Sequence, residues 1–226
     1  MIRVMIVDDE ILLRSCMQRI LESEPDIEVP LACDGRDALE GINTHRPDVV
    51  LLDLRMPEVD GLAVLDGIDR CTTSPAVAVL TTYLTDEEIT AALRSGASGF
   101  LLKDATPQEL AHAVRVLASG GTVMSSAAAR IVVDGYLGSG PWQDEPDQRL
   151  DSLTERERQV LDLLAEGRTN ADIGRRLIMS ASTTKEHVSA ILAKLGLANR
   201  VQAAVVAHRA AAAEGRKRSL ALAGTR

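Results

Sequence analysis

The sequence predicts an α/β doubly wound domain, built on a five-stranded parallel sheet, followed by a separate all-α domain of four helices. Three observations favour this fold class. Short apolar runs alternate with helical patterns up to about residue 120, residues 119–150 have the composition of a linker, and only helical patterns follow residue 152. Alternating strands and helices are typical of a parallel sheet covered on both faces. With 226 residues and 46% hydrophobic content, the chain can form two cores.

The first domain is expected to contain five strands and five helices in alternation. Apolar, β-branched runs predict strands at 2–7, 27–31, 48–52, 76–81 and 98–102. The stretches between them predict helices near 11–23, 35–44, 60–69, 85–95 and 106–118. Thr85 with Glu88, and Thr106 with Glu109, match the capping box that satisfies free N–H groups at a helix start. Gly96 is expected to end the fourth helix.

The domain boundary is expected between residues 119 and 150. A helix predicted at Ser125–Leu137 is broken by the Gly-Ser-Gly-Pro run that follows it, and residues 143–151 are polar and acidic. We therefore expect a first domain at 1–121, a linker with one helix at 122–150, a helical domain at 151–213 and a basic tail at 214–226.

The second domain is predicted to hold helices near 155–166, 169–176, 181–195 and 199–213. Thr154 with Glu157 and Thr169 with Asp172 again have capping-box spacing, and Ser180 is a good N-cap for the third helix. One face of that third helix, at 181–195, is polar and partly basic, whereas the opposite face is apolar. Together with the helix at 169–176 it would form a helix-turn-helix, in which a polar face on the second of the two helices fits the major groove of DNA.

Charge is divided unevenly along the chain. Residues 1–150 carry 12 Lys and Arg against 25 Asp and Glu, and residues 151–226 carry 13 against 8. The acidic front and basic back suggest different partners, with nucleic acid a candidate for the back, although scattered charge alone would give a similar imbalance. Aromatic residues make up 2% of the chain, which disfavours recognition by base stacking.

Cysteine usage and hydropathy indicate a cytoplasmic protein. The three cysteines, Cys16, Cys33 and Cys71, have neither disulfide nor metal-finger spacing, and we expect them to be reduced and buried. The chain starts directly with a strand, so no signal peptide is expected, and no apolar run is long enough to cross a membrane.

Chemistry-bearing residues follow four of the predicted strands. Carboxylates end the first and third strands, a hydroxyl ends the fourth and an ammonium follows the fifth, so all should meet at one sheet edge. These residues are Asp8, Asp9, Asp53, Thr81 and Lys103. No His or Cys is present to activate a nucleophile for hydrolysis. The set suits a phosphoryl group on Asp53, with Mg²⁺ held by Asp9 and Asp53, Asp8 orienting metal-bound water, and Lys103 and Thr81 contacting phosphate oxygens.

Residues 1–121 resemble the receiver domain of two-component response regulators. The motifs that carry the resemblance are Asp8-Asp9, Asp53 with Arg55-Met56-Pro57, Asp60-Gly61, Leu80-Thr81-Thr82 and the segment Gly96 to Asp104. The resemblance implies a flavodoxin-like fold, phosphorylation of Asp53 by a sensor histidine kinase, and a backbone carbonyl of Arg55 on Mg²⁺. It also implies that Thr81 and Phe100 form a switch pair. The chain departs from the pattern at Glu58, where many relatives carry Gly, and it lacks a Pro after Lys103.

Residues 153–206 look like the helix-turn-helix domain of LuxR/NarL-type transcription regulators. The match is carried by residues 183–188, 194–196 and 199–200. It implies that Lys185 and Ser189 approach DNA and that the helix at 199–213 helps the protein to dimerise. The candidate DNA-binding residues are Ser182, Thr183, Lys185, Glu186, His187 and Ser189. Glu186 either accepts a hydrogen bond from a cytosine amine or points away, and Thr184 stands where Val is often found.

Together these observations predict a phosphorylation-controlled transcription factor that binds double-stranded promoter DNA as a homodimer and has no membrane partner. Three alternatives remain from the residues alone. The first is a regulator whose receiver only dimerises, independently of phosphate. The second is an aspartate-nucleophile phosphatase, although that class usually has a second Asp where this chain has Arg55. The third is an adaptor whose helical domain binds protein.

Overall fold

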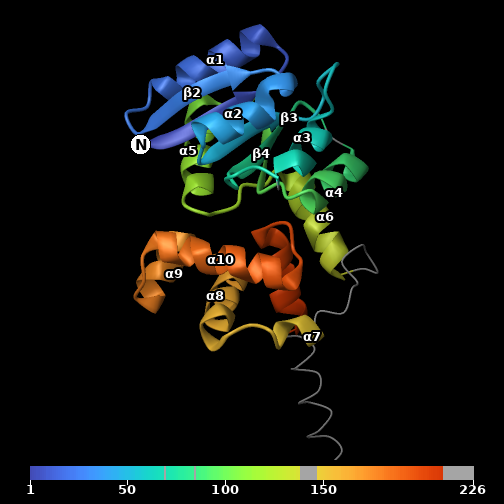
Figure 1. The fold of residues 1–226 in the computed structure, drawn as a ribbon. Coiled ribbons are helices and arrows are strands. Elements are labelled where there is room, and N and C mark those ends of the chain that lie inside the picture. Colours follow the sequence, from blue (N-terminus) through green and yellow to red (C-terminus); the bar gives the residue numbers. More distant parts are fainter. Residues whose placement is uncertain (69, 84, 138–146, 211–226) are drawn as a thin grey trace, which may run out of the picture. The chain divides into compact units, whose positions relative to one another are not determined.

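The computed structural model describes residues 1–68, 70–83, 85–137 and 147–210 (Figure 1). The chain divides into two compact units, Met1–Ile131 and Val132–Arg226, and each is considered by itself. The basic tail expected at 214–226, and the end of the helix expected at 199–213, lie outside the described residues.

The first unit is built on a five-stranded parallel sheet with the order β2-β1-β3-β4-β5, as the sequence predicted. The central strands β1 and β3 are continuous apolar runs because helices cover both faces of the sheet, and Val4–Val7 and Val49–Leu52 are 0% exposed. The strands are β1 (Ile2–Val7), β2 (Ile27–Cys33), β3 (Val49–Asp53), β4 (Ala76–Thr81) and β5 (Gly99–Leu102).

Two groups of helices cover the sheet. Helices α1 and α5 contact each other over one face, whereas α2, α3 and α4 form a contiguous row (Figure 1). Their bounds are α1 (Ile11–Glu22), α2 (Ala38–His45), α3 (Gly61–Ile68), α4 (Asp86–Arg94) and α5 (Pro107–Ala118). The capping boxes predicted at the starts of α4 and α5 are both present, and Gly96 follows α4 with a φ of 102°. A short 3-10 turn at Gly35–Asp37 precedes α2, where one continuous helix was expected.

At both edges of the sheet, a structural feature limits pairing with a further strand. The edge strand β2 contains Pro30, which has no N–H to donate, and its register with β1 shifts between Arg3 and Met5. At the other edge, Val123 forms a parallel bridge with Gly99, and its carbonyl accepts a hydrogen bond from the Phe100 N–H at 2.8 Å. The chain just after α5 therefore continues the sheet before α6 (Ser126–Leu137) begins.

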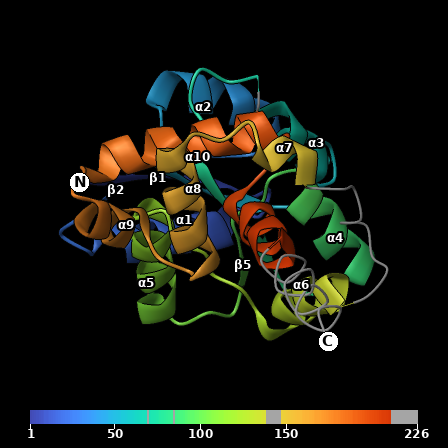
Figure 2. The same ribbon diagram turned by 90° about the horizontal axis from the view of Figure 1, so that it is seen from below.

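The second unit is a helical bundle around one apolar core. In Figure 2 the long helix α10 runs past α8 and α9, and it contacts both of them. The bounds are α7 (Asp147–Leu150), α8 (Glu155–Ala165), α9 (Asn170–Leu177), α10 (Ala181–Leu195) and a final helix over Arg200–Ala210. Helix α7 was not expected, because four residues in a polar stretch give no periodic signal. Its Leu150 joins the core with Leu153, Leu164 and Ile191.

Two sequence expectations about surface and membrane can be compared with the structure. Cys33 is buried, but Cys16 is exposed on α1 and Cys71 is half-buried, so the expectation that all three are buried was wrong. Among the described residues, no single helix combines the length and apolar character needed to span a membrane. Helix α10 and the helix after it would meet the criterion only as a pair bent by 68°.

Candidate functional site

Three carboxylates converge at the carboxyl edge of the sheet. Because β1 and β3 are neighbours with Val7 beside Leu52, the next residues of the two chain segments, Asp8 after β1 and Asp53 at the end of β3, lie next to each other. Oxygen atoms of Asp8, Asp9 and Asp53 all lie within 4.8 Å of one another. Asp8 is 0% exposed and Asp53 is 4% exposed, so the cluster is held in a region of low dielectric.

Lys103 supplies the positive charge of this cluster. Its Nζ lies 2.8 Å from Asp53 Oδ2, 2.9 Å from Asp8 Oδ2 and 3.3 Å from Glu10 Oε1. The Lys103 backbone N–H donates to the Thr81 carbonyl at 2.8 Å, which fixes the segment after β5 against the end of β4. Although burial alone would lower the pKa of Lys103, its bonds to Asp53 and Asp8 outweigh burial and raise the pKa.

The environment of Asp8 fits a divalent cation. Burial raises the pKa of the Asp8 carboxyl, and the ion pair of its Oδ2 with Lys103 Nζ at 2.9 Å offsets part of that rise. One lysine does not balance three clustered carboxylates, and a further cation among them would compensate the remaining negative charge. Three clustered carboxylates are also the oxygen donors that Mg²⁺ prefers. The acidic set predicted from the sequence is therefore suited to hold Mg²⁺.

The other two residues of the predicted pocket lie on β4 and β5. Thr81 ends β4, the strand next to β3, and is 8% exposed. Phe100 pairs with Val79 in the sheet and is 1% exposed, so the ring is packed in the interior. Asp53 Oδ1 accepts the backbone N–H of Arg55 at 3.1 Å.

The sequence analysis missed three contacts of this site. Glu10 approaches Lys103, and Arg14 donates from its guanidinium to the Asp8 carbonyl at 2.5 Å. The side chain of Arg55 is bound by both oxygens of Glu88, at 3.1 and 3.0 Å. This bond to Glu88 raises the pKa of Arg55, and the charge of Asp53 adds to the rise. No local sequence pattern predicts these pairs, because each depends on how a helix packs against a loop that is distant in the sequence.

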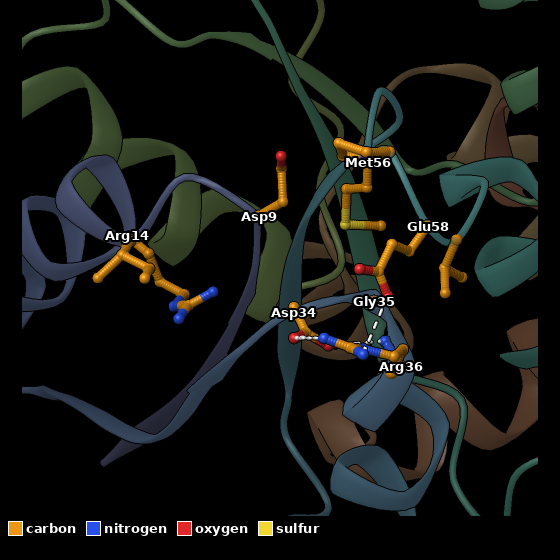
Figure 3. Close-up of a pocket in the computed structure, with 10 residues that line it drawn as sticks. Asp9, Arg14, Asp34, Gly35, Arg36, Met56 and Glu58 are labelled. Carbon is orange, nitrogen blue, oxygen red and sulfur yellow. Dashed lines mark hydrogen bonds and ion pairs between the residues drawn. The ribbon is translucent and has the colours of Figure 1, made fainter.

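A pocket of about 300 Å³ adjoins the acidic cluster on the side of Asp9. In Figure 3, Asp9, Arg14 and Met56 stand around it, and Arg36 bridges Asp34 and Glu58 across one wall. Arg36 lies 2.9 Å from Glu58 and 3.3 Å from Asp34. Glu58, the residue that departs from the receiver pattern, therefore ties the loop after β3 to the segment before α2. The side chains of Arg36 and Glu58 are largely exposed, so the ion pair between them is weak.

The second unit presents the predicted helix-turn-helix. Helix α9 is followed by its C-cap residue Ile178, which adopts a left-handed backbone with φ of 56°. Ser180 caps α10 by accepting the Thr183 N–H at 3.0 Å. The turn is tight, because a Cβ on Gly174 would lie 2.6 Å from the Met179 carbonyl oxygen. Thr184 is fully buried and its hydroxyl donates to the Ser180 carbonyl, so it fills the expected apolar position without leaving a polar group unpaired.

The predicted DNA-binding residues of α10 differ in exposure, and the four exposed ones share a helix face. Ser182, Lys185, Glu186 and Ser189 are exposed, and Thr183 and His187 are half-buried. The Thr183 hydroxyl is already 2.9 Å from that of Ser180 within the cap.

Several basic residues of the second unit serve its own structure. Arg149 donates to the Leu195 carbonyl at the end of α10, Arg156 to Leu177, Arg158 to Leu150 and Arg200 to Arg168. The positive charge of this half is therefore only partly available to a partner.

Comparisons with known proteins agree with both halves. Residues 4–115 match the model described as response regulator receiver domain, and residues 151–207 match the model described as bacterial regulatory proteins, luxR family. The transcriptional regulatory protein LiaR of Bacillus subtilis is 38% identical over 210 residues, covering 92% of this chain and 98% of LiaR. The chain belongs to the two-component response regulators with a LuxR-type DNA-binding domain. This response regulator is also 34% identical to the nitrate/nitrite response regulator NarL of Escherichia coli, over 91% of its own length and 94% of NarL.

Solved structures show the same family. A putative NarL receiver domain from Mycobacterium tuberculosis is 38% identical, with a TM-score of 0.50, and covers 53% of this chain and 97% of that one. A LuxR-family response regulator from Aurantimonas is 26% identical, with a TM-score of 0.54, over 60% and 98% of the two chains. The relatives are transcription regulators, which removes the phosphatase alternative.

The response regulator's α8 and α10 are joined by an ion pair between a buried glutamate and a partly exposed lysine. Glu157 is 5% exposed, and its Oε2 accepts from Lys194 Nζ at 2.7 Å and from the Thr154 backbone N–H at 2.7 Å. The same carboxylate thus begins α8 and anchors the last turn of α10. Lys194, and then Thr154, lower the pKa of Glu157 to about 2. This network ties the start of α8 to the last turn of α10, the helix with the predicted DNA-binding residues.

Acid should therefore destabilise the second unit in a defined window. Because the folded pKa of Glu157 is depressed from 4.5, its stabilisation is complete above pH 4.5 and is lost as the pH falls through about 2. Allowing for partial exposure of Lys194, we expect Glu157→Gln to cost about 2 kcal/mol at neutral pH and to flatten the acid transition. Amide exchange of α8 and α10 in the full chain measures both effects.

Glu109→Gln is the matched control for this prediction. It alters a capping box of the same kind at α5, in the other unit, where no lysine bonds to the glutamate in the described part of the chain. An acid transition of α8 and α10 that is as steep in Glu157→Gln as in the wild type would contradict the assignment.

Proposed function

We propose that Asp53 accepts a phosphoryl group from a sensor histidine kinase and that this modification controls dimerisation and binding to promoter DNA. The observation that carries the proposal is the cluster of Asp8, Asp9 and Asp53, in which Lys103 is bonded to the two buried members, Asp8 and Asp53. Clustering like charges costs free energy of folding, so such a cluster indicates a functional role for these side chains.

The residues divide the work of phosphoryl transfer between them. An oxygen of Asp53 attacks phosphorus, the P–N bond to the kinase histidine breaks, and its electron pair stays on the imidazole nitrogen. Lys103, already 2.8 Å from Asp53 Oδ2, would pair with a phosphate oxygen, and the Thr81 hydroxyl would donate to another. Mg²⁺ held by Asp8, Asp9, Asp53 and the Arg55 carbonyl would neutralise charge on the transferred group.

The proposed response is a shift in population. Moving the receiver from about 1% to about 99% active requires about 5.5 kcal/mol of differential stabilisation. Thr81 and the buried ring of Phe100 are the proposed switch pair, so repositioning Thr81 toward phosphate would change how the ring packs. We place the protein in the cytoplasm, where its kinase and its DNA partner would both reach it.

For DNA we propose that the exposed face of α10 enters the major groove, with Ser182, Lys185, Glu186 and Ser189 toward the bases or phosphates and Thr183 and His187 at the margin. A two-fold dimer would read two half-sites.

Footprinting of the full chain on genomic DNA fragments, with and without acetyl phosphate and Mg²⁺, tests the proposal. We expect protection of paired half-sites that strengthens at least about tenfold after phosphorylation, which corresponds to about 1.4 kcal/mol of coupling. Lys185→Ala should weaken binding and reduce the log–log salt slope by about one unit.

The charge-matched control is Arg94→Ala, an exposed residue at the end of α4 that should leave the salt slope unchanged. Equal protection with and without acetyl phosphate would instead support a receiver that only dimerises. If no fragment is protected at all, the DNA assignment fails, and the result supports an adaptor whose helical unit binds protein.

A further inference from the structure

Arg55 connects the loop after Asp53 to the first turn of α4. Its Nε donates to Glu88 Oε1 at 3.1 Å and a terminal nitrogen donates to Oε2 at 3.0 Å, which is the two-pronged geometry that guanidinium and carboxylate favour. Its backbone N–H donates to Asp53 Oδ1 at 3.1 Å. One residue therefore contacts the phosphoacceptor through its backbone and α4 through its side chain.

Glu88 has a second duty at the same point. Its Oε2 accepts the backbone N–H of Thr85 at 2.7 Å, and the Thr85 hydroxyl accepts the Glu88 N–H at 3.2 Å. This reciprocal pair is the capping box that begins α4. The carboxylate that holds Arg55 is thus also the one that defines where the helix starts.

The charge around Asp53 favours a second cation once a phosphoryl group is present. In the described part of the chain, Lys103 is the only cation that the structure pairs with Asp8 and Asp53, and it also approaches Glu10. A phosphoryl group carries a charge of about −1.5 to −2, where Asp53 alone carries −1. The backbone of Arg55 lies beside Asp53. Its side chain is 55% exposed, so the guanidinium can change partners without disturbing the core.

We propose that Arg55 is an additional phosphate-binding residue that Glu88 holds in reserve, and that the phosphoryl group on Asp53 competes with Glu88 for it. This inference rests on the proposed phosphorylation of Asp53. The Arg55–Glu88 ion pair is exposed to solvent. An ion pair of this kind favours the bound position of the side chain by only about twofold to fivefold. A dianion close to the same guanidinium can displace it.

Displacement of Glu88 from Arg55 would also affect the first turn of α4. Asp86, the first residue of α4, binds a terminal nitrogen of Arg130 on α6 through both of its oxygens, at 3.0 and 3.1 Å. Releasing Glu88 therefore changes the turn to which α6 is tied. The path from Asp53 to α6 passes through two ion pairs on one helical turn, Arg55–Glu88 and Asp86–Arg130.

The proposal is tested by measuring the affinity of the full chain for beryllofluoride, a phosphate mimic, in the presence of Mg²⁺. The wild type is compared with three variants. Glu88→Gln should raise the affinity by about twofold to fivefold, because the competitor for Arg55 is weakened while Gln still caps α4. Arg55→Ala should lower the affinity by a similar factor, because the phosphate partner is lost. Glu109→Gln, which alters the equivalent capping box at α5, should change nothing.

The side chain of Arg55 gives a direct second readout. Its Nε–H resonance should move when beryllofluoride is added to the wild type, and Glu88→Gln should show part of that movement without the mimic. If Glu88→Gln and Arg55→Ala shift the affinity in the same direction, the pair is only a structural tie and the inference is overturned. Wild-type protein that binds beryllofluoride with no change at Arg55 overturns it too. Failure of the wild type to bind the mimic at all, with acetyl phosphate also unreactive, would instead remove the proposed function on which the inference rests.

Discussion

Asp53→Asn should leave the response regulator completely unphosphorylated by acetyl phosphate and Mg²⁺, whereas the wild type gains one acid-labile phosphoryl group. The amide has the same shape as the carboxylate, so the neighbouring strands should keep their packing. It cannot attack phosphorus as an anion, however, and it removes one of the three clustered carboxylates. Intact-protein mass spectrometry before and after mild acid treatment measures the difference.

The control for this result is Asp66→Asn, a change at an exposed position on α3 outside the cluster. It should be phosphorylated like the wild type. A phosphoryl group that persists in Asp53→Asn would show that another residue is the acceptor, and the role assigned to the buried cluster would have to be given up.

Gly61→Ala should destabilise the first unit by about 3 kcal/mol, lowering its melting temperature by roughly 10 °C. A Cβ at this position would lie 2.3 Å from the Asp53 carbonyl oxygen and 2.5 Å from Leu54 Cα. Both atoms belong to the backbone of Asp53 and the residue after it, so the clash can be relieved only by moving the backbone of the acidic cluster. Thermal unfolding followed by amide exchange in β1 and β3 reports the stability, and acetyl phosphate labelling reports the site.

Gly67→Ala on the same helix provides the comparison. There the added Cβ meets the tip of the Leu39 side chain at 2.7 Å, which can turn aside, and Ala favours the helix more than Gly does. We expect a change within about 1 kcal/mol. Equal losses from the two substitutions would mean that the backbone contact at Gly61 is not what limits the packing.

Most of the fold could be predicted because it depends on local signals. The buried strands are apolar runs, and the starts of α4, α5 and α8 have capping boxes that the structure contains as predicted. The spacing at Thr169 was less informative, because Asp172 bonds to the Thr169 hydroxyl and not to its backbone N–H. The cluster of Asp8 with Asp53 was also predictable, because parallel neighbours bring their ends to one edge.

The rest of the site depends on contacts between elements distant in sequence. The partner of Arg55 is 33 residues away on α4, and Glu10 is 93 residues from Lys103. Neither pair has a spacing rule, because each is set by the angle at which a helix or loop meets the sheet. The charge count of the second half likewise does not show which side chains are available to a partner, since Arg149 and Arg158 donate to backbone carbonyls of their own unit.

The bridge between Gly99 and Val123 bears on how this receiver can be separated from the rest of the chain. A fragment cut at residue 121 would lose the strand-like residue that occupies the outer side of β5, and the Phe100 amide would be open to pairing. Such a fragment should self-associate by strand addition, a behaviour easily mistaken for regulated dimer formation. A fragment ending at Ile131 keeps its own cover and should stay monomeric in the absence of phosphate.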